Sequence, residues 1–164
     1  GEKTYTDRFG KDFRSHVLRY EKAGTAGSIS GDLCDHATLP VSSMNCFICT
    51  QTFNFIFDFQ QAISGSYIIL KDGGVLLATL ACMSPISRYD AERWGDFWRF
   101  TPQSAARCFG TVYGESNVTV TPLGNSAAAA LFMKGFALEE IRNKVRLDHV
   151  DELFPLVIGV RAVK

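Results

Sequence analysis

A histidine in an acidic loop is the first residue of this sequence with a type and setting suited to chemistry. His36 lies within residues 32–43, which also carry two aspartates and a proline. An imidazole near a ligand site is a candidate general base for taking a proton from a hydroxyl. The alternative is an exposed loop histidine with no role. The other two histidines, His16 and His149, fall in segments where a structural or solvated role is expected.

An aromatic and arginine-rich segment spans residues 88–100 and offers a second kind of chemistry. Aromatic faces stack on sugars or bases, and guanidinium groups bind phosphates through paired hydrogen bonds. The segment is therefore a candidate binding site for a small-molecule substrate, such as a glycan or a sugar nucleotide. An aromatic mini-core with arginine stems packed on the rings is the alternative. The candidate substrate-binding residues are Tyr89, Trp94, Trp98 and Arg99.

A C-x-x-C motif is formed by Cys46 and Cys49. Residues 45–50 are short, apolar and bounded by polar residues, which predicts a buried strand. On a strand, residues i and i+3 point to opposite faces, so the two thiols are not expected to share a metal. The five cysteines form an odd set, unlike the framework of a secreted disulfide-rich protein. The sequence therefore favours a reduced, cytoplasmic protein.

Strands that alternate with helices must position these residues, which predicts a single α/β domain over residues 1–164 with a mostly parallel sheet. The helix at 53–70 follows from apolar spacings of three and four, although Gly65 costs it about 1 kcal/mol. Thr101 and Pro102 have the types of a helix N-cap and first residue, and Gly114 is a stop signal. The expected strands are 15–20, 28–33, 45–50, 75–80, 117–121 and 154–163, and the strand at 75–80 is also expected to be buried. The expected helices are 53–70, 101–113 and 125 or 126 to about 136. A turn is expected at 71–74, and a charged, partly helical stretch at 139–151.

Composition excludes several classes of partner. The 164 residues are 46% hydrophobic, which is enough for a core. Lysine plus arginine number 17, as do aspartate plus glutamate, so the basic excess typical of nucleic-acid binding is missing. No apolar run reaches the roughly 18 residues of a membrane span, and the first ten residues hold no apolar targeting region. Neither nucleic acid nor a membrane is an expected partner.

Three segments in order carry a resemblance to a known family. Gly31-Asp32-Leu33 follows one expected strand, the strand at 45–50 comes next, and residues 70–77 read L-K-D-G-G-V-L-L. Together they resemble the class I S-adenosylmethionine-dependent methyltransferases over roughly residues 28–163. The resemblance implies a Rossmann-like sheet, mostly parallel with an antiparallel C-terminal strand, and S-adenosylmethionine as cofactor. Asn45 and Asp72 depart from the family pattern, which has aspartate and proline there.

The resemblance also implies cofactor-binding residues. Asp32 would accept a hydrogen bond from the adenine amino group, and the backbone N–H of Leu33 would donate to the ring. Thr50, Gln51 and Thr52 would lie near the methionine part of the cofactor or the reacting methyl group. The alternatives are that Asp32 is only a turn acid and that Gln51 and Thr52 only cap the following helix.

The family's glycine motif, G-x-G-x-G after a central strand, has no full counterpart here. If Gly1 aligns with its first glycine, Lys3 and Tyr5 occupy the places of the others. The resemblance therefore implies an N-terminally truncated or diverged member that lacks the first strand. The strands on either side of that gap would have open edges. Residues 1–10, or a strand from a second copy, would fill the gap, so a homo-oligomer that completes the sheet is a candidate assembly.

Two functions remain open from the sequence. The first is a methyltransferase acting on a glycan, a sugar nucleotide or another small molecule. The second is a non-catalytic domain that keeps the fold and serves assembly or interaction. A nicotinamide-dependent oxidoreductase is disfavoured, because that class also needs a glycine-rich loop, G-x-G-x-x-G, after a strand.

Overall fold

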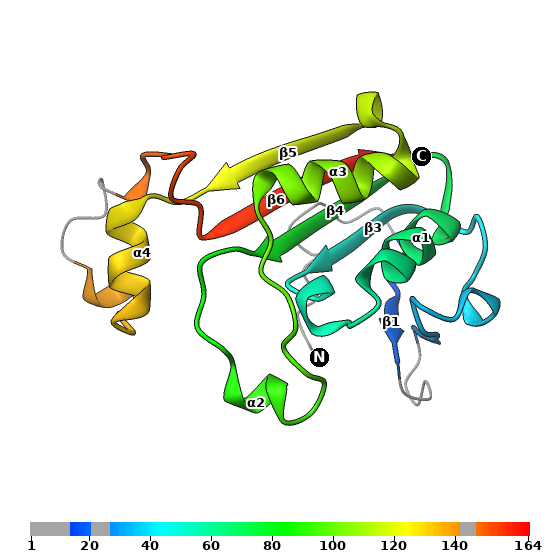
Figure 1. Ribbon diagram of the computed structural model, residues 1–164. Helices are drawn as coiled ribbons and strands as arrows, with labels where there is room; N and C mark the ends of the chain where they lie inside the picture. The colour runs from blue at the N-terminus through cyan, green and yellow to red at the C-terminus, as the bar shows by residue number, and fades with distance from the viewer. Residues whose placement is uncertain (1–13, 21–26, 142–146) are drawn as a thin grey trace.

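A computed structural model describes residues 14–20, 27–141 and 147–164. It contains a four-stranded sheet in the order β3-β4-β6-β5 and a separate two-stranded parallel sheet, β1-β2 (Figure 1). In the larger sheet, β3 is parallel to β4, and β6 is antiparallel to both β4 and β5. The predicted α/β fold, mostly parallel with an antiparallel C-terminal strand, is therefore confirmed. The strands are β1 (Val17–Arg19), β2 (Ser28–Ser30), β3 (Met44–Thr50), β4 (Leu70–Ala81), β5 (Val118–Leu123) and β6 (Val157–Val163).

Two helices, α1 (Phe59–Ile69) and α3 (Pro102–Tyr113), cover one face of the larger sheet (Figure 1). Because α1 links β3 to β4 and α3 links β4 to β5, the chain advances across the sheet in one direction. Right-handed crossovers that advance in one direction place their helices on one face. The core lies between these helices and the sheet, where the Phe53 and Phe109 rings meet edge to face at 5.5 Å. Two shorter helices, α2 (Arg88–Ala91) and α4 (Ser126–Met133), lie outside this layer.

Local capping signals set the ends of the helices. The Thr101 hydroxyl accepts from the Ser104 backbone N–H at 3.1 Å, and the Ser104 hydroxyl accepts from the Thr101 N–H at 3.0 Å. This capping box starts α3, and Gly114 ends it with a φ of 87°. Asn125 caps α4 by accepting from the Ala128 N–H at 2.8 Å. The three predicted caps and stops at these positions are confirmed, although α4 ends at Met133, before the predicted 136.

The helix predicted over 53–70 is wrong in its first six residues. A short 3-10 turn spans Phe53–Phe55, and α1 begins only at Phe59. The carbonyl of Asn54 accepts from the N–H groups of Phe97 and Trp98 at 2.9 and 3.2 Å, which takes the acceptor that a continuous helix needs. A tertiary contact therefore overrides the local pattern.

Gly65 is required in α1 by close packing. A Cβ at this position would lie 2.1 Å from the Leu33 carbonyl oxygen. The missing side chain lets the loop after β2 lie directly against the helix. Gly65 therefore lowers the helix propensity of α1 but permits the contact between α1 and the loop after β2.

Residues 71–74 were predicted as a turn, but they lie within β4. The pairing with β3 jumps from Met44↔Leu70 to Cys46↔Val75, so these residues bulge out of the ladder. They are held by Lys164: its carbonyl accepts from the Gly73 N–H at 2.8 Å, and its N–H donates to the Gly74 carbonyl at 3.0 Å. Pairing with the last strand turns a local turn signal into strand.

The two strands predicted as buried are buried on one side only. In β4, Leu76, Ala78 and Leu80 are buried, while the residues between them are half-buried. In β3 only Cys49 is buried. The other strand boundaries shift by a few residues. The strand expected at 15–20 is Val17–Arg19, the one at 28–33 is Ser28–Ser30, the one at 117–121 is Val118–Leu123, and the one at 154–163 is Val157–Val163. The charged stretch holds a 3-10 turn, Leu138–Glu140, and its residues 142–146 lie outside the described part.

None of the helices that the structure describes covers the opposite face of the larger sheet, which we call the bare face. Its residues form four rows across the strands, set by the pairing registers. The first and last rows are apolar, the second combines apolar side chains with Arg161 and Thr119, and the third carries threonines. The rows are Cys46, Val75 and Val163; then Ile48, Leu77, Arg161 and Thr119; then Thr50, Thr79, Gly159 and Thr121; then Ala81, Val157 and Leu123.

β3 is an edge strand in the described structure, since its pairing runs only to β4, and β1 and β2 stand in a sheet of their own. The segment predicted to fill the gap between them, residues 1–10, lies outside the described residues. None of the described helices is long and apolar enough to cross a membrane.

Candidate functional site

Three segments that are distant in sequence meet at the N-terminal end of α1. The loop after β2 reaches it through the Cys34 thiol, which donates to the Asp58 carbonyl at 3.6 Å. The segment after β3 leads directly into the helix. The segment 84–99 reaches it through the Trp98 indole N–H, which donates to the carbonyls of Ile56 and Phe57, each at 3.1 Å. The structure thus brings together most of the residues predicted from the sequence.

The loop after β2 is a tightly bonded turn. Asp32 Oδ1 accepts from the Cys34 N–H at 2.8 Å, and the Asp32 N–H donates to the Thr38 hydroxyl at 2.9 Å. Leu33 is buried beneath the turn. One oxygen of Asp32 therefore has the turn-forming role considered from the sequence, and the adenine contact remains a prediction for this carboxylate.

The turn after β3 holds Gln51 in a left-handed backbone conformation, with a φ of 50°. Such a conformation costs a non-glycine residue about 1–3 kcal/mol and is concentrated at functional sites. The Gln51 N–H donates to the Thr79 carbonyl at 2.9 Å, which fixes the turn to the end of β4. Its Nε2 is buried without a hydrogen-bond partner in the described part of the chain.

The predicted capping role of Thr52 is not the one observed. Thr52 stands at the N-cap of the 3-10 turn, but its side chain makes no capping hydrogen bond. Its hydroxyl donates instead to the Thr50 carbonyl at 3.1 Å. Both threonines thus stay at the carboxyl end of β3, beside the strained Gln51.

Asn54 is a candidate site residue that the sequence did not reveal. It is only 3% exposed, and its Oδ1 has no hydrogen-bond partner among the described residues. Its side chain also hydrogen bonds to the Asp96 carboxylate. A buried polar atom without a partner costs about 1–3 kcal/mol. Two such atoms, on Gln51 and Asn54, lie within four residues of each other, which makes this turn a candidate ligand site.

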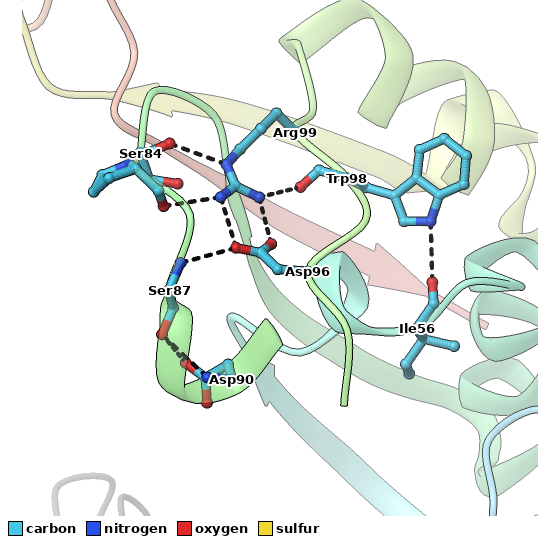
Figure 2. Close-up of polar contacts among 8 residues, drawn as sticks. Ile56, Ser84, Ser87, Asp90, Asp96, Trp98 and Arg99 are labelled. Carbon is cyan, nitrogen blue, oxygen red and sulfur yellow. Dashed lines mark hydrogen bonds and ion pairs between the residues drawn. The ribbon is translucent and has the colours of Figure 1, made fainter. Parts of the chain in front are cut away.

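Asp96 and Arg99 form a partly buried ion pair that holds the segment 84–99 (Figure 2). Arg99 Nη1 and Nη2 donate to the two Asp96 oxygens at 2.6 and 2.8 Å. The remaining Arg99 N–H groups donate to the carbonyls of Ser84, Pro85 and Trp98. All five N–H groups of Arg99 are therefore engaged, and a phosphate would have to displace one of these bonds.

The same pair fixes the charge of Asp96. Hydrogen bonds from Arg99 lower the pKa of this carboxyl, and the Ser87 N–H adds to the effect with a hydrogen bond at 3.1 Å. The Asp96 side chain is 2% exposed. Arg99, predicted as a substrate residue, thus has the geometry of a residue that positions this segment.

The predicted aromatic acceptor residues separate in the structure. Trp98 packs among rings at the N-terminal end of α1, with centroids 5.1 Å from Phe59 and 6.0 Å from Phe57. Tyr89 and Trp94 are exposed, and the Arg93 guanidinium lies over the Tyr89 ring at 3.5 Å. Trp94 and Trp98 do not share a helix face, because α2 already ends at Ala91.

An open cavity of about 340 Å³ lies beside Trp98. Its lining combines two kinds of group, aromatic rings and the polar side chains of the first turn of α1, with no lysine or arginine among them. This combination suits a ligand with hydroxyl groups and an apolar face better than it suits a phosphate. The lining residues are Phe57, Asp58, Phe59, Gln60, Gln61 and Trp98.

His36 lies close to this cavity, and one of its two ring nitrogens already makes a hydrogen bond. Its Nε2 is 3.0 Å from the Gln61 carbonyl, a distance at which a protonated Nε2 donates to that oxygen. That tautomer leaves Nδ1 as the basic nitrogen. His16 and His149 are exposed and lie elsewhere.

The two thiols of the C-x-x-C motif face opposite sides of β3, as predicted. Cys46 is exposed on the bare face, whereas Cys49 is buried against the helices. Burial raises the pKa of the Cys49 thiol to about 12. The two sulfur atoms cannot act together.

Comparison with known proteins rests on structure. No family model and no curated protein matches the sequence. A methyltransferase from Thermotoga maritima that depends on S-adenosylmethionine superposes with a TM-score of 0.53 at 15% identity, over 84% of this chain and 63% of that one. A second one, from Mesorhizobium loti, gives 0.53 at 14% identity, over 92% and 81%. The chain has the fold of the class I S-adenosylmethionine-dependent methyltransferases.

The methyltransferase fold confirms the resemblance stated from the sequence, and at these identities the likeness concerns the fold alone. The chain spans 63% of the Thermotoga maritima protein and 67% of a similar methyltransferase from Archaeoglobus fulgidus. The [4+2]-cyclase SpnF also shares the fold, with a TM-score of 0.50 at 12% identity, over 84% of this chain and 55% of that one. Because one fold serves more than one reaction, activity has to be argued from the site.

Proposed function

We propose that this chain binds S-adenosylmethionine at the carboxyl end of β3 and transfers its methyl group to a hydroxyl of a neutral sugar, glycan or similar small molecule. The observation that carries the proposal is the turn after β3, where Gln51 is strained and two buried amide atoms have no hydrogen-bond partner among the described residues. In open α/β sheets, ligands bind beyond the carboxyl ends of the strands. The turn lies at that edge.

The residues present fit the cofactor. Asp32 offers a carboxylate for the adenine amino group, Leu33 offers a buried apolar side chain and a backbone N–H, and Gln51 offers an amide donor. Thr50 and Thr52 stand on either side of Gln51. Gly1 is proposed as a further contact from the resemblance alone, because it lies outside the described residues. When bound, the cofactor supplies an electrophilic methyl group on a sulfonium.

The cavity beside Trp98 is the proposed acceptor site. The Trp98 and Phe57 rings offer faces for a sugar ring, and the polar side chains of Asp58, Gln60 and Gln61 offer hydrogen bonds to hydroxyls. Nδ1 of His36 is the candidate base. The engagement of every Arg99 N–H argues against a phosphate at this place, so a neutral sugar is favoured over a sugar nucleotide. Tyr89 and Trp94 would contact only an extended glycan.

Calorimetric titration with S-adenosylhomocysteine tests the cofactor site. We expect micromolar affinity, a loss of at least tenfold in Asp32→Asn, and little change in the matched control Asp35→Asn. Asparagine preserves the turn at both positions and removes only the charge. An absence of binding at millimolar ligand would overturn the proposal and leave the non-catalytic assembly domain considered from the sequence.

Methyl transfer itself requires a second measurement, because a chain with this fold can bind the cofactor and catalyse another reaction. Radiolabelled S-adenosylmethionine with a panel of neutral sugars should label a sugar in the unaltered chain and fail to do so in Trp98→Ala. Tight cofactor binding without transfer to any member of the panel would refute the proposed acceptor class.

A further inference from the structure

We propose that the bare face binds the α4 region of a second copy of this chain. The α4 region, which we define as residues 124–156 without the undescribed 142–146, connects β5 to β6. In Figure 1 it stands at the far left, beyond the end of β5 and away from the two layers. The inference concerns assembly and does not depend on the proposed function.

The bare face has the properties of a surface that is covered in the functional protein. Sheets of parallel strands are normally covered on both faces. Here Val75, Ile48 and Leu77 lie next to one another on paired strands and are only half-buried. A hollow of about 330 Å³ opens between Ile48, Leu77 and the threonine row, and Gly159 contributes no side chain to fill it. The hollow can take a bulky apolar side chain.

The face carries one kind of charge. Arg161 is exposed at the edge of the hollow and is the only charged residue among the described positions of the four rows. Its neighbours on the paired strands are Leu77 and Thr119, neither of which can neutralise it. A partner that fits this face must therefore bring apolar side chains and a carboxylate.

The α4 region has the matching composition. Phe132, Met133, Phe136 and Leu138 are between 46% and 61% exposed, an unusual density of large apolar side chains for a solvated segment. Two exposed carboxylates, Glu139 and Glu140, follow directly. Apolar residues followed by acidic ones are what the hollow and Arg161 require.

A rigid attachment makes the α4 region suited to docking. Asn125 donates to the His149 carbonyl at 2.6 Å while it caps the helix. The Gly124 carbonyl accepts from the Asp151 N–H at 2.9 Å. The base of the region is thus fixed, and its helix stands away from the two layers of the same copy (Figure 1). A second copy can bring the apolar side chains of this region to the bare face.

Reciprocal exchange accounts for both surfaces at once. If each copy gives its α4 region and receives that of its partner, a twofold axis relates the two contacts and the assembly closes as a dimer. The interface then forms twice, which favours the dimer over an open chain of single contacts. This arrangement differs from the dimer predicted from the sequence, which would complete the edge of the sheet.

Sedimentation analysis of the full chain tests the proposal. At micromolar concentration we expect twice the chain mass of 18.1 kDa. Arg161→Glu should yield a monomer, and so should the pair Phe132→Ser with Phe136→Ser. Arg107→Glu reverses an exposed arginine on α3, on the other side of the sheet, and should stay dimeric.

Mixing the variants separates this interface from a general loss of folding. The Arg161→Glu chain keeps an intact α4 region and the Phe132→Ser, Phe136→Ser chain keeps an intact face, so their mixture should regain a dimer with one native contact. The charge reversal Glu139→Arg with Glu140→Arg should restore the Arg161→Glu dimer when placed in the same chain. A monomeric unaltered chain, or a dimer that all these variants retain, would overturn the proposal. Binding of S-adenosylhomocysteine by the unaltered chain is measured in parallel, because it tests the proposed cofactor site separately from the oligomeric state.

Discussion

The Asn54 side chain hydrogen bonds to the carboxylate of Asp96, and this contact ties the turn after β3 to the segment that carries Trp98. On the far side of Asp96, Arg99 closes the segment with bonds of 2.6 and 2.8 Å. The proposed cofactor turn and the proposed acceptor wall are thus connected through one buried carboxylate. Damage to that carboxylate should affect both.

We expect Asp96→Asn to lower the free energy of unfolding by about 1.5–3 kcal/mol, the range for hydrogen bonds to charged groups. The substitution leaves the Arg99 charge with carbonyl partners only. Urea unfolding followed by tryptophan fluorescence measures the change. Arg88→Lys is the matched control, because Arg88 pairs with Glu92 on an open surface, where ion pairs contribute little. Equal losses in both variants would contradict the structural role of the Asp96–Arg99 pair.

The lowered pKa of Asp96 predicts an acid-sensitive contribution to stability. Above its unfolded pKa of about 3.9 the carboxyl is ionised in both states, and the contribution is complete. As the pH falls further, the unfolded state takes up the proton first, so the contribution is lost progressively until the folded pKa is passed. The free energy of unfolding measured from neutral pH down to acid should therefore drop less in Asp96→Asn than in the unaltered chain. Parallel curves for the two would refute the assignment.

Gly65→Ala should destabilise the protein by about 1–3 kcal/mol, the usual cost of overpacking. The added methyl would lie 2.1 Å from the Leu33 carbonyl oxygen and push the loop away from α1. Because Asp32 precedes Leu33, affinity for S-adenosylhomocysteine should fall as well. Gly110→Ala is the control, since the nearest atom to a Cβ on this helical glycine is Cγ of the flexible Glu115 side chain, at 3.2 Å, and the Glu115 Cα lies at an ordinary contact distance of 3.6 Å. A stable Gly65→Ala protein with full affinity would contradict the close contact.

Gln51→Gly should separate stability from binding. Glycine relieves the left-handed strain at this position, so the free energy of unfolding should rise or stay constant. The lost amide should weaken binding of S-adenosylhomocysteine by at least tenfold. Ser42→Gly offers the comparison, because Ser42 has a φ of 46° at the start of the sheet, away from the site. It should gain similar stability at unchanged affinity, and a binding loss of equal size in both variants would count against a role for Gln51.

Features specified by neighbouring residues could be predicted from the sequence. Thr101, Pro102 and Gly114 define α3 because capping depends on side chains within one turn of the helix end. The opposed thiols of Cys46 and Cys49 follow from the period of a strand alone. The fold could be predicted because motifs on three segments follow one another in the order of the methyltransferase pattern.

Features that depend on contacts across the fold were missed. The late start of α1 depends on the Asn54 carbonyl, which is taken by Phe97 and Trp98, more than forty positions away in the sequence. The full engagement of Arg99 depends on carbonyls of residues 84 and 85, which no periodicity identifies. The left-handed Gln51 had no signal at all, since glycine or asparagine is the usual residue there.

The position of β6 has a consequence for how the protein is made. β6 is the last of the six strands that the structure describes, yet it lies between β4 and β5, and β5 pairs only with β6 in this part of the chain. A nascent chain that has emerged through β5 therefore holds a strand with nothing to pair with. Its apolar side chains stay exposed while the next thirty or so residues are translated, roughly two to six seconds at typical bacterial and eukaryotic rates. We expect chaperones to bind this half of the sheet during that interval.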